Sequence, residues 1–359
     1  MKYKSNAGFS HSQSDKLGVL ITNLGTPESP TSGALRPYLK QFLSDPRVVE
    51  VPKFIWWGIL NLVILNIRPK RSAKAYASVW TDDGSPLMHI TKAQCQALAA
   101  RCAQTYGDDV VVDFAMRYGN PAVDDVIERM LAKGVRKLIV LPLYPQYCAS
   151  TTASTFDAVA ADFTKRRWIP ELRFVTHYHD DSGYIQALAN KVRAHWDERG
   201  KADMLVMSYH GIPKRYLLNG DPYHCECHKT SRLLAEALGL QETQYMTTFQ
   251  SRFGREEWLQ PYTDFTMKAL PGKGVKSVQV VCPGFSADCL ETIEEIGEEN
   301  KEYFMEAGGE RYEYIEALNS DPEHIEVMFN LVEQNLSGWR IEKNMTTRQR
   351  LAQALGATE

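Results

Sequence analysis

The sequence predicts an α/β protein built from two doubly wound halves, each a parallel sheet flanked by helices. Short β-branched apolar runs alternate with longer helical patterns along most of the 359 residues, which is typical of βαβ units. Leu138–Leu141 is apolar on both faces, as a strand covered by helices on both sides must be. The alternation is interrupted at Arg166–Pro170, so we expect the boundary between the halves there.

The elements follow in chain order. The expected strands are the short apolar runs Leu17–Leu24, Val110–Met116, Lys137–Leu143, Leu172–His177, Met204–Tyr209, Gln244–Phe249 and Ser277–Val281. The expected helices are the longer stretches that separate most of them: Ile90–Tyr106, Ala122–Lys133, Ala153–Lys165, Tyr184–Arg199, Thr230–Leu238, Glu257–Leu270 and Leu290–Ala307. A closing helix at Pro322–Leu336 is expected to pack back across the junction, and Thr347–Leu355 shows a short amphipathic pattern.

These elements divide the chain into four parts. Residues 1–16 form a polar N-terminal segment, 17–170 the first half, 171–336 the second half and 337–359 a C-terminal tail. A chain of this length commonly forms two domains.

Composition excludes several classes of protein. A net charge of −3 and a pI near 6.3 argue against general nucleic-acid binding. Seven scattered cysteines do not resemble a disulfide framework. The polar N-terminus has no apolar signal region, so we expect a cytoplasmic protein.

One segment stands out for its hydrophobicity. Phe54–Ile67 contains two tryptophans and no charge, and basic residues flank it on both sides. It is shorter than the roughly 20 residues that span a bilayer. The pattern fits a peripheral membrane contact or the lip of an apolar ligand site, and a buried core helix is the alternative.

The ends of the strands carry the functional signals, because ligands bind beyond the carboxyl ends of strands in open α/β sheets. The first strand is followed by Gly25 and Pro27 and lacks the G-x-G-x-x-G spacing, which argues against a nicotinamide or flavin enzyme. At the second, Arg117 and Tyr118 emerge, and an arginine there can pair with a carboxylate or remain a surface residue.

The third and fifth strands end in further candidates. The third strand ends in Leu141–Tyr147, whose two prolines and two tyrosines, Tyr144 and Tyr147, form a rigid apolar wall with hydroxyl tips. Ser150 follows, as a helix cap or a polar ligand contact. His210 ends the fifth strand, and an imidazole there suits proton abstraction or metal ligation at neutral pH, although a structural histidine is equally plausible.

A column of carboxylates follows the seventh strand. The spacing of 3, 4, 4 and 3 places five side chains on one face of an α-helix: Asp288, Glu291, Glu295, Glu299 and Glu302. Like charges there repel by roughly 0.2–0.5 kcal/mol per pair, so the stripe suggests a cation-handling function. An acidic solvated face near a helix N-terminus is the alternative. Together with His210, the stripe indicates proton removal coupled to cation handling.

Six motifs in this order resemble the ferrochelatase family, which inserts ferrous iron into a porphyrin: Asn23–Pro27, Arg117–Tyr118, Tyr144–Tyr147, Ser208–Pro213, Thr248–Ser251 and Phe285–Thr292. The resemblance runs from about Leu17 to Leu336. It implies two Rossmann-like, chelatase-like domains that enclose a porphyrin cleft.

The resemblance also implies roles for single residues. His210 and Glu291 would be the catalytic residues and the metal contacts, with Glu295 and Glu299 as a cation or proton path. The expected porphyrin contacts are Leu24, Tyr118 and Trp258, to which the strand ends add Arg117, Tyr144 and Ser150.

The implied reaction inserts Fe²⁺ into protoporphyrin IX with release of two protons, as the last step of haem biosynthesis. Iron would be a substrate, and no cofactor is expected. The implied partners are the porphyrin, Fe²⁺ and a membrane that Phe54–Ile67 contacts peripherally at its inner face. The chain would act as a monomer or homodimer and would bind no nucleic acid.

Two features depart from parts of the family. Cys289 stands where some relatives have a histidine, and no cysteine follows it, so a [2Fe–2S] cluster on a C-terminal extension is not expected. Tyr223–His228 contains Cys225 and Cys227 between histidines. A metal or iron–sulfur cluster at this pair is the less favoured interpretation, because C-x-C lacks the usual C-x-x-C loop.

Two alternative functions remain open at this point. One is a chelatase for another tetrapyrrole, coproporphyrin or sirohydrochlorin. The other is a porphyrin or haem carrier without catalysis. The presence of both His210 and Glu291 favours an enzyme, and the long apolar segment favours the dicarboxylic porphyrin.

Overall fold

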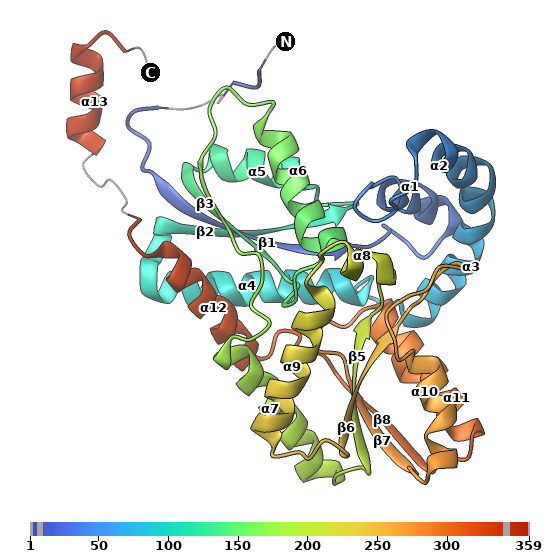
Figure 1. The fold of residues 1–359 in the computed structure, drawn as a ribbon. Coiled ribbons are helices and arrows are strands. Elements are labelled where there is room, and N and C mark those ends of the chain that lie inside the picture. The colour runs from blue at the N-terminus through green and yellow to red at the C-terminus, as the bar shows by residue number, and fades with distance from the viewer. Residues whose placement is uncertain (1–2, 6–9, 340–344, 358–359) are drawn as a thin grey trace.

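The computed structural model describes residues 3–5, 10–339 and 345–357. These residues form two four-stranded parallel sheets with helices packed around them (Figure 1). The predicted α/β class with parallel sheets is therefore confirmed.

The first sheet has the order β2-β1-β3-β4. Its strands are β1 (Lys16–Gly25), β2 (Val110–Tyr118), β3 (Val135–Pro142) and β4 (Glu171–Phe174). β1 and β3 lie in the centre and are almost completely buried, as strands covered on both faces must be. β4 follows the boundary predicted at residue 170 and yet pairs with β3, so the first sheet extends past that boundary.

The helices of the first half are α1 (Ser32–Leu43), α2 (Lys53–Ile59), α3 (Leu65–Val79), α4 (Pro86–Tyr106), α5 (Val123–Ala132) and α6 (Ser154–Phe163). Two π-helical segments, Leu60–Ile64 and Ala149–Ala153, adjoin them. α1 was not predicted, because Gly33 and Pro37 inside it weaken the helical pattern. Thr31 caps it by accepting a hydrogen bond from the amide of Ala34.

The second sheet repeats the arrangement with the order β6-β5-β7-β8. Its strands are β5 (Met204–His210), β6 (Tyr245–Gln250), β7 (Ser277–Val281) and β8 (Arg311–Ile315). β8 was not predicted. It is a short edge strand in which charged residues alternate with aromatic ones, so it lacks the apolar run of a central strand.

The helices of the second half are α7 (Ser182–Arg199), α8 (Lys214–Leu218), α9 (Tyr223–Leu238), α10 (Thr263–Ala269), α11 (Asn300–Glu306) and α12 (Pro322–Leu336). α9 begins at Tyr223 rather than at Thr230. The helix predicted from Glu257 begins only at Thr263, because Pro261 lacks the amide that a continuing helix needs. The helix predicted over Leu290–Ala307 is instead π-helical from Glu291 to Glu299 and continues as α11.

The two halves share one core. α12 contacts α4, β3 and α7, so the closing helix bridges the halves as predicted (Figure 1). The largest cluster of buried side chains contains residues of both sheets, among them Ile21 and Met207. In the tail, α13 (Met345–Ala354) coincides with the predicted amphipathic pattern, and Arg348 on it forms an ion pair with Asp15 at 2.9 Å. Within the residues described, no helix has the length and apolar character needed to cross a membrane.

Candidate active site

A cavity of about 440 Å³ is lined by residues of both halves. The order of strands reverses between β1 and β3 in the first sheet and between β5 and β7 in the second. Ligands of open α/β sheets bind at such switch points. The residues at these strand ends line the cavity: Leu24 at β1, Tyr144 after β3, His210 at β5 and Phe285 after β7.

The imidazole of His210 is held in one orientation. Its Nδ1 lies 2.7 Å from the carbonyl oxygen of Gly211. A carbonyl only accepts, so Nδ1 carries the proton and Nε2 keeps the lone pair that can take a proton or bind a metal. At Gly211, a Cβ would lie 2.8 Å from the Gln250 carbonyl oxygen and 3.2 Å from the Trp258 ring. A glycine is therefore needed for the chain to turn so closely behind His210.

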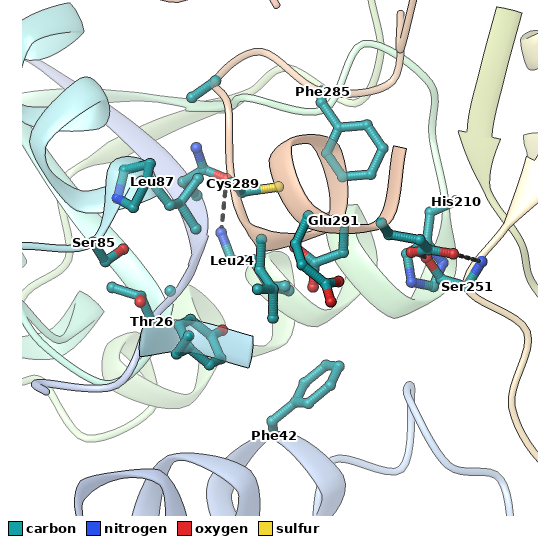
Figure 2. A pocket seen from close by; sticks show the side chains of 18 of the residues that line it. Leu24, Thr26, Phe42, Ser85, Leu87, His210, Ser251, Phe285, Cys289 and Glu291 are labelled. Atoms are coloured by element: carbon teal, nitrogen blue, oxygen red, sulfur yellow. Dashed lines mark hydrogen bonds between the residues drawn. The ribbon is translucent and has the colours of Figure 1, made fainter. Parts of the chain in front are cut away.

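The carboxylate stripe is shorter than predicted. Glu291, Glu295 and Glu299 line the cavity from the π-helical segment, together with Glu294. Figure 2 shows Glu291 between Leu24 and His210, on the wall that the second half contributes. The side chains of His210 and Glu291 therefore lie on the same wall of the cavity rather than opposite each other.

The two ends of the predicted stripe lie elsewhere. Asp288 precedes the helical segment and is buried, where it accepts hydrogen bonds from Tyr314 at 2.6 Å and Asn319 at 2.7 Å. Its role is to anchor the chain before the helix, because its carboxylate has protein partners. Glu302 lies on α11, is exposed, and is not among the residues that line the cavity.

Glu295 follows Glu291 on the π-helical segment, and Ser251 holds its carboxylate. Its Oε1 accepts a hydrogen bond of 2.7 Å from the Ser251 amide, and its Oε2 accepts one from the Ser251 hydroxyl. Burial raises the pKa of Glu295 to about 7, which the hydrogen bonds from Ser251 oppose and the charge of Glu291 reinforces. A carboxyl group that titrates near neutral pH can both hold and release a proton.

The first half supplies an apolar wall with free hydroxyls. Phe42 points into the cavity from α1, below Leu24 in Figure 2. Within the described residues, the buried hydroxyls of Thr26 and Tyr144, and of Ser286 from the second half, have no hydrogen-bond partner, and all three residues line the cavity. Such hydroxyls are places where a bound ligand can form hydrogen bonds.

Two arginines that sequence reasoning did not assign to the site come from α3. Arg68 and Arg71 line the cavity, and the Arg68 guanidinium lies 4.9 Å from the centre of the Phe253 ring. Burial lowers the pKa of Arg68, while the charge of Glu291 favours its cationic form. The sequence showed these arginines only as the basic flank of Phe54–Ile67, because nothing in it fixes the direction in which α3 continues.

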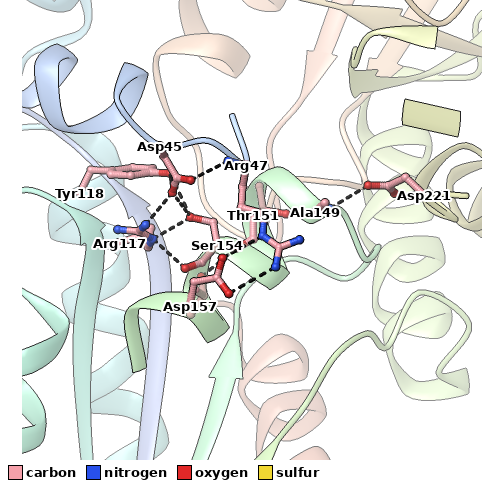
Figure 3. Close-up of polar contacts among 10 residues, drawn as sticks. Asp45, Arg47, Arg117, Tyr118, Ala149, Thr151, Ser154, Asp157 and Asp221 are labelled. Atoms are coloured by element: carbon pink, nitrogen blue, oxygen red, sulfur yellow. Dashed lines mark hydrogen bonds and ion pairs between the residues drawn. The ribbon is translucent and has the colours of Figure 1, made fainter. Parts of the chain in front are cut away.

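Arg117 and Tyr118 do not line the cavity. Figure 3 shows Asp45 between them: its Oδ2 lies 2.6 Å from Arg117 Nη2 and accepts a hydrogen bond of 2.8 Å from the Tyr118 hydroxyl. Arg117 also donates to the Ser154 hydroxyl at 2.7 Å. The carboxylate expected to come from a ligand is thus supplied by the protein, and the cluster braces the segment that follows Tyr144.

Ser150 and Trp258 are also outside the residues that line the cavity. The Ser150 hydroxyl lies 3.0 Å from Cys148 Sγ, and the neighbouring Thr151 lines the cavity instead. Trp258 packs behind His210, against Gly211. Cys225 and Cys227 lie on different sides of α9, because residues two apart in a helix point in different directions. Cys225 is exposed and Cys227 is buried.

The apolar segment is exposed. Phe54, Trp57 and Leu62 are 80%, 65% and 70% exposed, whereas Leu60 and Leu65 pack inward. The alternative of a buried core helix is therefore wrong for most of the segment. α3 continues from it directly to Arg68 and Arg71, so the segment adjoins the mouth of the cavity.

Comparisons with known proteins show which family the chain is similar to. The family model described as Ferrochelatase matches residues 16–336. The ferrochelatase of Idiomarina loihiensis is 70% identical over 352 residues, which cover 98% of this chain and 97% of that protein. The ferrochelatase of Pseudoalteromonas atlantica is 65% identical over 358 residues, or 99% of each chain.

A solved structure is similar in fold. SirB from Bacillus subtilis, determined with Fe³⁺, superposes with a TM-score of 0.50 at 12% identity and covers 90% of this chain and 96% of its own. This likeness supports the chelatase-like architecture of two parallel sheets. With the family match over nearly the whole length and curated relatives at this identity, the chain belongs to the ferrochelatase family.

Proposed function

We propose that the chain carries out its reaction in the cavity between the two halves, with His210 and Glu291 as the groups that act on the porphyrin and the metal. The reaction follows from the family: the chain is a metal chelatase that inserts ferrous iron into protoporphyrin to make haem. The observation that carries the proposed location is that both side chains line one cavity with a carboxylate path behind them.

The geometry suggests separate tasks for the two groups. A porphyrin must lose two pyrrole protons before its four nitrogens can hold Fe²⁺. His210 has Nε2 free because Nδ1 donates to Gly211, so it can accept a proton or contact the incoming metal. Glu291 adds a carboxylate oxygen, a weaker ligand for Fe²⁺ than a second imidazole. Weak ligation suits a metal that must be passed on to the porphyrin.

Glu295 and Glu299 extend from Glu291 along the π-helical segment. Glu299 is exposed, and Glu295 lies between it and Glu291 with a pKa of about 7. This order allows protons to leave, or Fe²⁺ to enter, from the solvent side. π-Helical segments occur often at functional sites, and the wider turn brings these side chains to one side of the cavity.

The first half is proposed to hold the macrocycle. Leu24 and Phe42 offer apolar contact, and Tyr144 offers an unpartnered hydroxyl. Arg68 and Arg71 are cations that can pair with the two carboxylates of protoporphyrin. Arg117, Tyr118, Ser150 and Trp258 contribute indirectly, by bracing the walls, and are not proposed as contacts of the substrate.

The exposed segment Phe54–Ile67 is proposed to touch the inner face of the cytoplasmic membrane. Its apolar side chains lie next to the mouth of the cavity, and Lys53, Lys70 and Arg71 flank it. Protoporphyrin is apolar and partitions into membranes, so a contact there shortens its route to the site. Sedimentation with anionic vesicles tests this: Trp57→Ser with Leu62→Ser is expected to weaken binding, and equal binding would refute the contact.

The experiment that tests the location is anaerobic insertion of Fe²⁺ into protoporphyrin, followed by absorbance. Glu291→Gln is expected to abolish measurable turnover while porphyrin still binds. Glu302→Gln is the matched control, since this carboxylate is close in sequence and does not line the cavity. Equal turnover by Glu291→Gln and wild type would place the reaction elsewhere, and porphyrin binding without turnover by the wild type would indicate a carrier.

A further inference from the structure

A second group of metal-ligating side chains lies outside the cavity. His177 and His179 follow β4, and Glu226 lies in the first turns of α9. One candidate ligand atom from each of the three residues lies within 4.8 Å of the other two. None of the three lines the cavity in which iron is inserted.

The carboxylate of Glu226 is the centre of the group. Its Oε1 lies 2.7 Å from His177 Nδ1, and its Oε2 lies 3.2 Å from His179 Nδ1. Oε2 also accepts a hydrogen bond of 2.6 Å from the Tyr147 amide. Burial by itself raises the pKa of Glu226, but the neighbouring His179 and His177 side chains and the Tyr147 amide outweigh it, so the pKa lies below its usual range.

The environment of His179 is the feature that indicates a bound ligand. Its side chain is about nine-tenths buried, and within the described residues its Nδ1 has no hydrogen-bond partner, although Glu226 Oε2 is close. A buried nitrogen without a hydrogen-bond partner costs stability. A nitrogen lone pair beside a carboxylate oxygen at this distance matches two ligands of one cation, since ligands on tetrahedral Zn²⁺ lie about 3.3 Å apart.

Charge also favours a cation at this place. Nearby Asp180 is neutralised by Lys229, whose Nζ lies 2.5 Å from Asp180 Oδ2. Among the described residues, Glu226 has no lysine or arginine as an ion-pair partner, so its carboxylate is available to a cation. Two nitrogens and one oxygen form the mixed ligand set that Zn²⁺ and similar ions bind.

We propose that His177, His179 and Glu226 bind a divalent transition metal, of which Zn²⁺ is the best match, at a site separate from the iron-insertion cavity. The half-exposed His177 leaves room for a water molecule as the fourth ligand. The metal would tie the segment after β4 to α9. It would also fix the turn before Tyr147, because Tyr178 donates to the Pro145 carbonyl oxygen at 2.9 Å and Glu226 accepts from Tyr147. The same turn carries Tyr144 and Gln146 of the cavity wall.

Within Tyr223–His228, the proposed metal ligand differs from the Cys225–Cys227 pair considered from the sequence. The ligand is the glutamate between the two cysteines, because Cys225 is exposed and Cys227 faces the core. His224 stacks on Phe249, His228 contacts both of these rings at a tilt, and neither histidine is part of the group.

The first test measures Zn²⁺ retained after equilibrium dialysis of the full chain, by metal analysis. His179→Ala and His177→Ala are each expected to retain one Zn²⁺ per chain fewer than the wild type. Loss of an outer-shell partner already weakens metal sites by about 10–100-fold, so loss of a ligand is expected to raise the Kd by at least about 100-fold. Counts are compared between variants, because the cavity also contains metal-binding side chains.

His224→Ala is the matched control, since it removes a histidine from the same helix without touching the group. It is expected to bind as the wild type does. His177→Ala keeps the test valid if His179→Ala does not fold, because His177 is half exposed. Crystals soaked in Zn²⁺ give the position: anomalous scattering is expected between His177, His179 and Glu226. Equal zinc in all variants, or no anomalous peak there, would overturn the proposal in favour of a purely hydrogen-bonded group.

Discussion

Glu295→Gln removes a titratable group from the proposed proton path while keeping the size of the side chain. The pKa of Glu295 is about 7 in the folded chain, against 4.5 for an ordinary glutamate. The folded state therefore keeps this proton to higher pH than the unfolded state does. The contribution of Glu295 to stability is complete below pH 4.5 and is lost as the pH rises through about 7.

The size of the effect follows from the difference in pKa. A gap of about 2.5 pKa units corresponds to about 3 kcal/mol in total, of which about 2.5 kcal/mol lies between pH 5 and pH 8. Relative to the wild type, Glu295→Gln is expected to become more stable by about this amount over that interval. Denaturant unfolding of both proteins at pH 5, 6, 7 and 8 measures it. Parallel profiles for the two proteins would refute the raised pKa.

The same variant tests the path in catalysis. Glutamine cannot exchange a proton, so we expect slower iron insertion at saturating porphyrin, with an unchanged Kd for porphyrin because Glu295 lies behind Glu291. We also expect the rate of the variant to lose the pH dependence that a group of pKa about 7 gives the wild type. Wild-type rates and pH dependence in Glu295→Gln would show that protons and iron do not use this route.

Three further expectations concern the walls and the core. Arg117→Ala removes one partner of the buried pair with Asp45 and is expected to lower the free energy of unfolding by about 3 kcal/mol, while porphyrin titration gives an unchanged Kd; weaker binding would make Arg117 a substrate contact. Gly211→Ala puts a Cβ 2.8 Å from the Gln250 carbonyl oxygen, so we expect about 1–3 kcal/mol of destabilisation and slower turnover from a displaced His210, and normal turnover would contradict the close packing. Burial lowers the pKa of His324 to about 4, so its contribution to stability is present above pH 6.5 and is lost as the pH falls toward 4. Relative to His324→Asn, the wild type is expected to lose about 2 kcal/mol of unfolding free energy between pH 7 and pH 5. Parallel dependences of stability on pH in the two proteins would exclude this.

Sequence reasoning succeeded where local pattern decides the outcome. Buried parallel strands can be recognised in a sequence as short apolar runs. Because the carboxyl ends of such strands lie at one edge of the sheet, His210 and the glutamates after β7 could be expected to share a site. The position of Leu24 and Tyr144 at the cavity follows from the same rule.

Sequence reasoning failed where a residue distant in the sequence determines what a side chain contacts. Arg117 was expected to meet a ligand carboxylate, but Asp45, which lies 72 residues away in sequence, occupies its guanidinium. Asp288 fits the spacing of the stripe, yet the helical segment begins after it, and partners on and after β8 hold its carboxylate. The π-helical turn is equally hidden, because spacings of three and four suit an ordinary α-helix.

The unpartnered nitrogen of His179 shows the same limit. Nothing in the sequence links residues 177 and 179 to residue 226, and only the packing of α9 against the segment after β4 brings them together.

The most direct test of the account is the rate of anaerobic Fe²⁺ insertion by His210→Ala at saturating protoporphyrin, beside His195→Ala as a histidine paired with Glu313 outside the cavity. We expect His210→Ala to bind porphyrin with a normal Kd and to insert no measurable iron, whereas His195→Ala turns over as the wild type does. Full turnover by His210→Ala would contradict the central claim that its imidazole acts on the porphyrin and the metal.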